Sequence, residues 1–260
     1  MRIIYRSSIA LFFVALAFLN TSCKVQKYKS DANPISHAIW DSLLQKHVSE
    51  AGWVDYEGFI ADSTQLNRYL DLLSAHHPNE TNWTADERLA YWINAYNAFT
   101  VKLIVDHYPV VSIKDIKRGI PFVNSVWDIK FIQIEGATYD LNNIEHGIIR
   151  QRFEEPRIHF AVNCASVSCP KLANFAFTAT ELDTQLTRVA KGFLADPSKN
   201  KFVSPQKAEL SKIFSWYGGD FKKEGDLIDY VNQYAPQQLN ADADIDYLDY
   251  NWNLNDSKTN

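Results

Sequence analysis

A long amphipathic stretch between residues 84 and 109 constrains the fold of this chain more than any other feature. It begins with Thr84-Ala-Asp-Glu87, a capping box in which the Thr84 hydroxyl accepts a backbone N–H and the Glu87 carboxylate reaches back. Apolar residues then recur three and four positions apart until Pro109 ends the pattern. They are Leu89, Trp92, Ile93, Tyr96, Phe99, Leu103 and Ile104. The pattern predicts one long helix with an apolar face.

Asn97 falls inside the apolar stripe of this helix, between Ile93 and Thr100. A buried side-chain amide that finds no hydrogen-bond partner costs on the order of 1–3 kcal/mol. Asn97 is therefore expected either to hold a neighbouring loop by hydrogen bonds or to belong to a polar site.

Shorter helices are predicted wherever apolar residues recur at the same spacing. A second capping box, Thr178-Ala-Thr-Glu181, starts a helix that Asp196-Pro197 ends. Asp140 or Asn142 is placed to cap another. The predicted helices cover about residues 35–48, 63–75, 142–149, 178–195 and 226–234.

Strands are predicted where apolar and polar residues alternate. Residues 127–141 are typical of a hairpin that turns at Glu135-Gly136. Residues 157–163 are predicted as a strand, with the apolar residues on one face and His159 on the other. In residues 245–254 the alternation slips by one position, which indicates a strand with a bulge.

Helices therefore dominate, and the strands are interspersed among them irregularly. This order favours an α+β fold, a single helix-rich domain with a small, mostly antiparallel sheet. Neither internal repeats nor low-complexity linkers occur past residue 33. We therefore expect one domain over residues 34–255.

The N-terminal residues indicate export. Arg2 and Arg6 precede an apolar run that is too short to span a bilayer, which is typical of a signal peptide over residues 1–22. Small residues then precede Cys23, as in the lipobox of a bacterial lipoprotein. We expect a lipid on Cys23, a polar tether over residues 23–33, and a membrane-anchored lipoprotein of the cell envelope, periplasmic or at the surface. The alternative is an ordinary secretory signal with an incidental cysteine.

The composition excludes some classes of partner. The formal net charge is −5, and Lys and Arg are scattered rather than grouped with aromatic residues, so no nucleic-acid partner is expected. No dinucleotide fingerprint or phosphate-binding loop is present, and we predict no cofactor. The substrate and any protein partner are not specified by the sequence.

Reactive side chains are concentrated between residues 142 and 170. This stretch contains Glu145 and His146 in one block and His159, Asn163, Cys164 and Cys169 in the next. Further blocks of the same kind are Tyr91–Asn97, Ile144–His146, Leu210–Tyr217 with Asp220-Phe221, and Tyr247–Leu254. Together with the block from Arg157 to Pro170, they resemble the family called domain of unknown function 547. The resemblance covers about residues 84–254, and it implies an identity without a mechanism.

Cys164 is the candidate nucleophile. A thiolate is reactive at neutral pH only when a His, a cation or a helix N-terminus lowers its pKa. On the predicted strand, His159 would lie about 16 Å from Cys164 and on the opposite face. We therefore expect a Cys164–His146 pair, with Asn163, Glu145 or the loop amides as orienter or oxyanion donor. These residues predict a thiol-dependent hydrolase or acyl transferase, similar in chemistry to papain or transglutaminase.

Other interpretations remain open. An oxidising compartment favours a Cys164–Cys169 disulfide, which would leave a non-catalytic module that binds a glycan, a peptide or a partner protein. A redox-active pair, inert reduced cysteines and a zinc site that adds His146 and Glu145 are further alternatives, although no tight metal-ligand spacing is present. His159 is also typical of a hydrogen-bonded core residue. The aromatic residues around Trp216 and Trp252 are expected to pack in the core, or else to line a groove.

Overall fold

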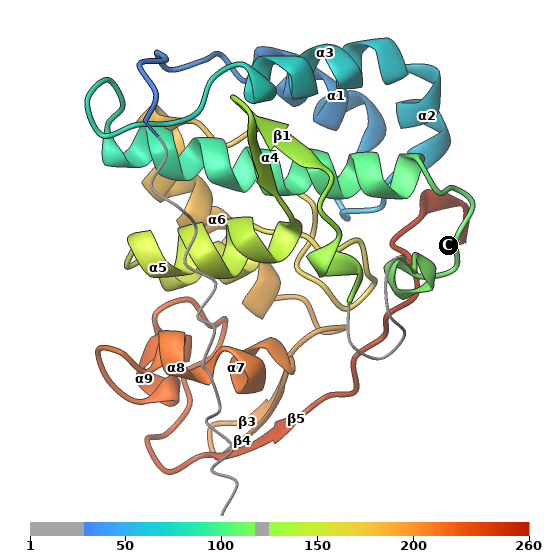
Figure 1. Cartoon of the computed structure of the whole chain (residues 1–260). Coiled ribbons are helices and arrows are strands. Elements are labelled where there is room, and N and C mark those ends of the chain that lie inside the picture. Colours follow the sequence, from blue (N-terminus) through green and yellow to red (C-terminus); the bar gives the residue numbers. More distant parts are fainter. Residues whose placement is uncertain (1–28, 118–124, 260) are drawn as a thin grey trace, which may run out of the picture.

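The structure is a computed structural model that describes residues 29–117 and 125–259 (Figure 1). The predicted signal peptide (1–22), the lipidation site Cys23 and the first part of the tether lie outside the described residues. Within the described ranges, no helix has both the length and the apolar character that a membrane span requires.

The long predicted helix forms as α4 (Ala85–Val105) and lies at the centre of the fold. Its capping box is complete, because the Glu87 N–H donates to the Thr84 hydroxyl and the Thr84 N–H donates to the Glu87 carboxylate. Helices α1 (Ala38–His47), α2 (Tyr56–Ala61) and α3 (Ser63–Ser74) cover one side of α4 (Figure 1).

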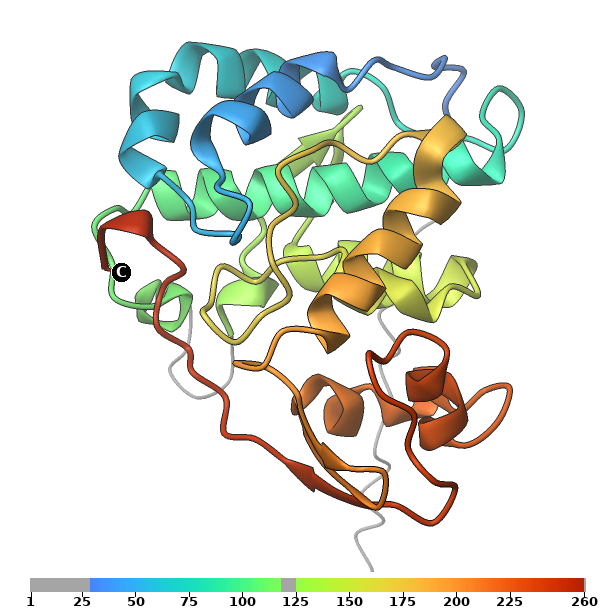
Figure 2. The same cartoon turned by 180° about the vertical axis from the view of Figure 1, so that it is seen from behind.

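The other side of α4 is covered by two segments from the middle of the chain. One is a π-helix, η3 (Asn143–Ile149), continued by α5 (Arg150–Arg152). The other contains a short turn, η5 (Ala179–Glu181), and α6 (Leu182–Leu194), which is seen best from behind (Figure 2). Because α4 is covered on both sides, most of its residues are buried.

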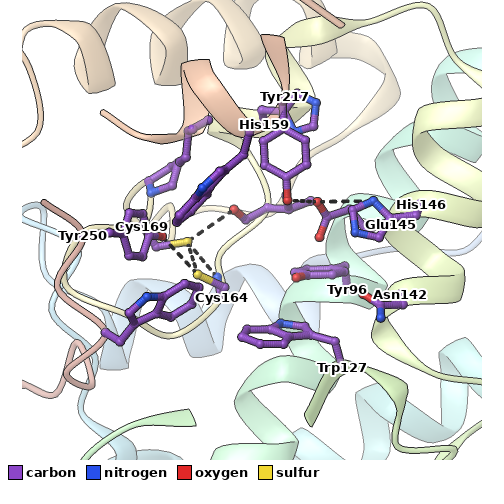
Figure 3. Close-up of a pocket in the computed structure, with 15 residues that line it drawn as sticks. Tyr96, Trp127, Asn142, Glu145, His146, His159, Cys164, Cys169, Tyr217 and Tyr250 are labelled. Carbon is purple, nitrogen blue, oxygen red and sulfur yellow. Dashed lines mark hydrogen bonds and ion pairs between the residues drawn. The ribbon is translucent and has the colours of Figure 1, made fainter. Parts of the chain in front are cut away.

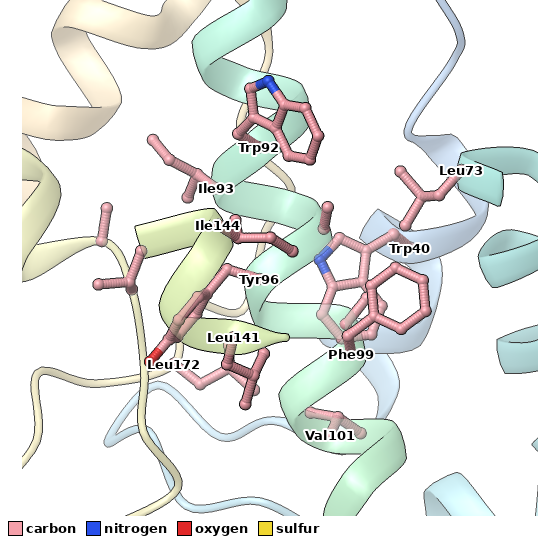
Figure 4. Close-up of a cluster of buried hydrophobic side chains, with 14 of the residues drawn as sticks. Trp40, Leu73, Trp92, Ile93, Tyr96, Phe99, Val101, Leu141, Ile144 and Leu172 are labelled. Carbon is pink, nitrogen blue, oxygen red and sulfur yellow. The ribbon is translucent and has the colours of Figure 1, made fainter. Parts of the chain in front are cut away.

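A first hydrophobic cluster surrounds α4 (Figure 4). Trp40 has no exposed surface, and its ring stacks on Tyr69 at a centroid distance of 5.7 Å. Truncating such a side chain to alanine typically costs 3–5 kcal/mol, because the transfer energy is lost and a cavity remains. The side chains drawn in Figure 4 include Trp92, Ile93, Tyr96, Phe99, Leu141 and Ile144.

A second hydrophobic cluster is separate from the first and includes Phe160, Phe193, Phe214 and Phe221. It is enclosed by α6, by a three-stranded sheet and by three short helices (Figure 1). In the sheet β4 is central, antiparallel to β3 and parallel to β5. The elements are β3 (Lys201–Ser204), β4 (Lys207–Leu210), α7 (Ile213–Trp216), α8 (Gly218–Phe221), α9 (Leu227–Asn232) and β5 (Asp244–Tyr247).

The predicted hairpin is confirmed, in a shorter form. Strands β1 (Ile132–Ile134) and β2 (Ala137–Tyr139) pair antiparallel. Both turn residues have positive φ, 46° at Glu135 and 82° at Gly136, which suits the twist of a two-residue hairpin. Asp140 then accepts the Asn143 N–H at 2.6 Å and caps η3, as predicted. The α+β class, helix-rich with small and mostly antiparallel sheets, is confirmed.

The strand predicted at residues 157–163 is wrong. The segment forms a 3-10 helix, η4 (Pro156–Phe160), which starts with a proline and is capped by the Glu155 side chain. Its apolar alternation has another cause: Ile158 packs in the first hydrophobic cluster and Phe160 in the second. The short helix is buried on two sides, each against a different cluster, and this produces the same alternation of residues as a strand.

Two other local predictions differ from the structure. The capping box at Thr178 does not form; the Thr178 N–H donates to the Gln185 side chain, and η5 precedes α6. The strand predicted over 245–254 stops at Tyr247, and the slip in alternation marks its end rather than a bulge.

Beyond β5, the C-terminal segment (residues 248–259) runs back to the first helices (Figure 1). It pairs with residues 166–168, where the Val167 N–H donates to the Asn253 carbonyl at 2.9 Å. Further along, the Val54 N–H donates to the Asn255 carbonyl, also at 2.9 Å. The segment therefore joins the two ends of the described chain. Three short turns complete the fold: η1 (Ile113–Asp115), η2 (Val126–Asp128) and η6 (Ser257–Thr259).

Candidate functional site

A pocket of about 260 Å³ brings together most of the reactive residues singled out in the sequence (Figure 3). Its walls come from α4, η2, η3, η4, α7 and the C-terminal segment. Segments that are far apart in the sequence therefore form one site. The lining residues are Tyr96, Trp127, Asn142, Glu145, His146, His159, Val162, Cys164, Cys169, Pro170, Ile213, Trp216, Tyr217, Tyr250 and Trp252.

The cysteine loop (residues 163–170) forms one wall, and buried amides fix its shape. Asn97 donates to the Ala161 carbonyl and accepts the Asn163 N–H, each at 2.9 Å. Asn97 therefore holds a loop, one of the two roles expected for it. The Asn163 side chain in turn donates to the Pro170 carbonyl and accepts the Ala165 N–H. Ala165 has a φ of 58°, an uncommon conformation for a residue with a side chain.

The Cys164 sulfur is surrounded by hydrogen-bonding side chains (Figure 3). It lies 2.7 Å from the Cys169 sulfur, 3.3 Å from the Ser166 hydroxyl and 3.4 Å from the Tyr250 hydroxyl. Burial raises the pKa of Cys164, but these hydrogen bonds outweigh it and leave the pKa below its ordinary value. Burial and the neighbouring Cys164 raise the pKa of Cys169 well above the ordinary value. The pair therefore favours one negative charge, on Cys164.

The opposite wall of the pocket is formed by the π-helix η3. Glu145 is 5% exposed, and its Oε1 accepts a hydrogen bond of 2.8 Å from the Tyr217 hydroxyl. His146 is half-buried, and its Nδ1 lies 3.0 Å from an Arg150 guanidinium nitrogen. Because a guanidinium only donates, Nδ1 accepts, and the neutral ring carries its proton on Nε2. π-Helical turns are frequent at functional sites, and this one places two consecutive side chains in the pocket.

His159 is anchored behind this wall. Its Nε2 donates to Asp220 at 2.8 Å, and its ring stacks on Tyr217 at a centroid distance of 3.9 Å. Burial lowers the pKa of His159, although the bond to Asp220 opposes this. The hydrogen bond from His159 and the guanidinium of Arg150 hold the pKa of Asp220 well below its usual range. His159 is therefore held by Asp220 and packs against the ring of Tyr217.

Aromatic side chains form the rest of the pocket. Trp216 is 48% exposed, and its ring lies 4.7 Å from Tyr250 and 5.9 Å from Trp252. Trp127 contacts Trp252 from η2 at 5.6 Å. Trp216 and Trp252 therefore line the pocket, the second of the two roles expected for them, whereas Phe214 is buried in the second hydrophobic cluster.

The expected Cys164–His146 hydrogen bond is not made among the described residues, although both side chains line the pocket. They lie on opposite sides of it (Figure 3). His159 also lines the pocket. Its exclusion as a partner of Cys164 assumed an extended strand, and that assumption does not hold for the 3-10 helix that forms. Asn163 lies outside the lining, and its amide is used within the cysteine loop.

Cys164 and Cys169 are free thiols in this structure. In residues 29–117 and 125–259, no group of three or more His, Cys, Asp or Glu side chains is placed to hold a metal ion. The zinc site considered from the sequence is therefore not formed by its four residues, which are Glu145, His146, Cys164 and Cys169.

Comparison with known protein families gives a match to part of the chain. The model of the family described as Protein of unknown function, DUF547 matches residues 80–194. These residues are a DUF547 domain. The match includes Glu145, His146 and the cysteine loop but ends before Tyr217 and Tyr250, short of the end near residue 254 that the resemblance implied. Neither a curated protein nor a solved structure matched the chain.

Several residues of the site were not singled out in the sequence. Ser166 and Tyr250 contact the Cys164 sulfur, whereas Arg150 and Asp220 fix the histidines on the other side. Asp220 and Tyr250 lie in or next to segments that carry the family resemblance, but no local pattern assigns them to the pocket. Only the tertiary fold brings them to the DUF547 domain.

Proposed function

We propose that this chain is a thiol-dependent hydrolase or acyl transferase with Cys164 as its nucleophile. One observation carries the proposal: the Cys164 sulfur lines a pocket and lies within hydrogen-bond distance of three side chains that can donate to a thiolate, the Cys169 thiol and the hydroxyls of Ser166 and Tyr250. Such donors stabilise a thiolate, the reactive form of cysteine. Burial and the nearby cysteines raise the pKa of Tyr250, so its hydroxyl stays protonated and continues to donate.

The reaction begins when the Cys164 thiolate adds to the carbonyl carbon of an ester or amide in the pocket. The tetrahedral intermediate collapses, the bond to the leaving group breaks, and that group departs with a proton from solvent. The acyl group is then bound to sulfur as a thioester. Water or an acceptor nucleophile attacks this thioester, and the thiolate is released.

The wall opposite Cys164 supplies donors for the negative charge that develops on the carbonyl oxygen. In the tautomer fixed by Arg150, the His146 Nε2–H has no hydrogen-bond partner among the described residues, and the same is true of the Tyr96 hydroxyl. Both side chains line the pocket. His146 therefore serves as an N–H donor rather than as the base that activates the thiol.

The test uses p-nitrophenyl acetate with the reduced protein. We expect a burst of p-nitrophenolate close to one equivalent, and mass spectrometry should locate an acetyl thioester on Cys164. Cys164→Ala should abolish the burst and leave the melting temperature nearly unchanged. Cys169→Ser should retain acylation at a lower rate. An acetyl group on another residue, or a burst that survives in Cys164→Ala, would refute the proposal.

Dithiol–disulfide exchange is a second candidate, favoured by the 2.7 Å separation of the two sulfur atoms. Cys164 faces the pocket and Cys169 is buried, which is the arrangement of an attacking and a resolving thiol. In this reaction a substrate disulfide is reduced to two thiols while Cys164 and Cys169 are oxidised to a disulfide. Cys169→Ser separates the candidates, because it should stop the reaction with oxidised glutathione at the mixed disulfide on Cys164, with one glutathione released instead of two, while acylation continues.

We also propose, from the sequence, that the domain is exported and attached to a membrane of the cell envelope by a lipid on Cys23. The arginines, the apolar run and the small residues before Cys23 support this. In cells that express the full chain, Cys23→Ser should move the protein from the membrane fraction to the soluble fraction. A protein that stays membrane-bound after this change would contradict lipid attachment at Cys23.

A further inference from the structure

Glu145 is a buried carboxylate without a cationic partner. Its side chain is 7% exposed, and Oε1 accepts one hydrogen bond, from the Tyr217 hydroxyl. His146 Nδ1 lies 4.0 Å away, but this nitrogen is the acceptor of the Arg150 contact and donates nothing. Oε2 has no hydrogen-bond donor among the described residues. A buried charge is costly unless a charged or polar group compensates it.

The guanidinium of Arg150, which contacts His146 and Tyr217, is already paired. Arg150 binds Asp220 at 2.6 Å through Nε and contacts His146 through a terminal nitrogen. In the pocket lining, Glu145 is the one Asp, Glu, Lys or Arg residue. The described part of the pocket therefore carries a single fixed carboxylate and no cationic side chain to balance it.

The other walls suit a cation. Six aromatic side chains line the pocket, and indole and phenol faces attract cations through their quadrupoles. Such contacts already occur at the margins of this site: the Lys114 ammonium lies 3.6 Å from the Trp252 ring centroid, and the Arg150 guanidinium lies 4.9 Å from that of Tyr217. The lining aromatics are Tyr96, Trp127, Trp216, Tyr217, Tyr250 and Trp252.

We propose that the pocket binds a cationic group, an ammonium or guanidinium carried by the substrate, with Glu145 as its counter-charge and the aromatic walls around it. The site of bond cleavage then lies at Cys164, on the opposite wall. This placement of the cleaved bond rests on the proposed function, whereas binding of the cation does not. The substrate class is therefore an ester or amide with a positive charge close to the carbonyl.

The first experiment compares two thiol reagents on the reduced protein. Both are methanethiosulfonates, one with a trimethylammonium-ethyl group and one with a neutral methyl group. The thiolate attacks the reagent sulfur, a mixed disulfide forms and methanesulfinate leaves. The ratio of the two rates at Cys164, divided by the same ratio for 2-mercaptoethanol, cancels differences in intrinsic reactivity and in thiolate fraction.

We expect this normalised ratio to be about tenfold in favour of the cationic reagent, the size of effect that one carboxylate and aromatic faces give in a partly open site. Glu145→Gln should lower it to about one, and Glu224→Gln, an exposed carboxylate outside the pocket, should leave it unchanged. A ratio near one in the unmodified protein, or a preference that survives in Glu145→Gln, would overturn the proposal.

A second measurement does not depend on the thiol or on any variant. Tetramethylammonium chloride, with sodium chloride at equal ionic strength, should change the tryptophan fluorescence saturably, because three tryptophans line the pocket. The neutral isostere tert-butanol should not. If Cys164 reacts with neither reagent but tetramethylammonium binds, the nucleophile is refuted and the cation site stands. If tetramethylammonium fails to bind, the cation site is refuted whatever the thiol does.

Discussion

Replacing Asn97 by alanine tests the connection between the central helix and the cysteine loop. The change removes two buried hydrogen bonds and leaves the Ala161 carbonyl and the Asn163 N–H without partners. Both groups belong to residues that are at most 3% exposed, so water replaces the lost amide poorly. Each unsatisfied group costs about 1–3 kcal/mol, and the free energy of unfolding should therefore fall by about 2–6 kcal/mol.

The measurement is urea unfolding followed by tryptophan fluorescence. The matched control is Thr100→Val on the same helix, because the buried Thr100 hydroxyl has no partner among the described residues. The similar shape of valine should change the free energy by no more than about 0.5 kcal/mol, or stabilise the protein. Asn97→Ala should also slow alkylation of Cys164, since the loop loses its anchor. A destabilisation below about 1 kcal/mol, or one equal to that of the control, would refute the assigned role.

Three further predictions concern titrating groups. Tyr250→Phe removes one donor to Cys164, which should raise its pKa and slow iodoacetamide alkylation at pH 7 about fivefold; an unchanged rate would contradict the contact. Burial lowers the pKa of His37 to about 4, below its ordinary value near 6.5, so stability is complete above pH 6.5 and is lost as the pH falls toward 4. Between pH 7 and pH 4.5, the free energy of unfolding of the unmodified protein should fall by about 2 kcal/mol more than that of His37→Gln, as measured by urea unfolding. An equal fall in the two proteins would contradict this. Asp220→Asn leaves Arg150 and His159 without their anion and should cost about 2–4 kcal/mol in the same assay, whereas a variant of normal stability would show that the cluster is dispensable.

The elements that the sequence predicted well are those whose signals are local. The capping box at Thr84 and the apolar stripe behind it define α4 without help from the rest of the chain. Glu135-Gly136 likewise defines its own turn, because the two positive φ angles are set within the hairpin. Residues 157–163 failed because their alternation arises from two separate hydrophobic clusters, and a linear pattern does not distinguish this from a strand.

The candidate site was predictable in part, for the same reason. Glu145, His146, Cys164 and Cys169 are close in sequence, and the structure places all four in one pocket. Their pairing was not predictable, because Arg150 fixes the tautomer of His146 and distant residues surround the sulfur. The aromatic residues that line the pocket come from segments whose composition is equally typical of a hydrophobic core. Only the fold shows whether such residues pack in the core or line a pocket.

The C-terminal segment determines when the site comes into existence during synthesis. A ribosome makes the cysteine loop long before the final wall of the pocket, since Tyr250 follows Cys164 by 86 positions. Until Tyr250 and Trp252 emerge and dock, the nascent chain has its thiols in place but not the enclosure around them. The surroundings of the Cys164 sulfur are therefore a property of the finished fold, and they are complete only once the C-terminal segment is in place.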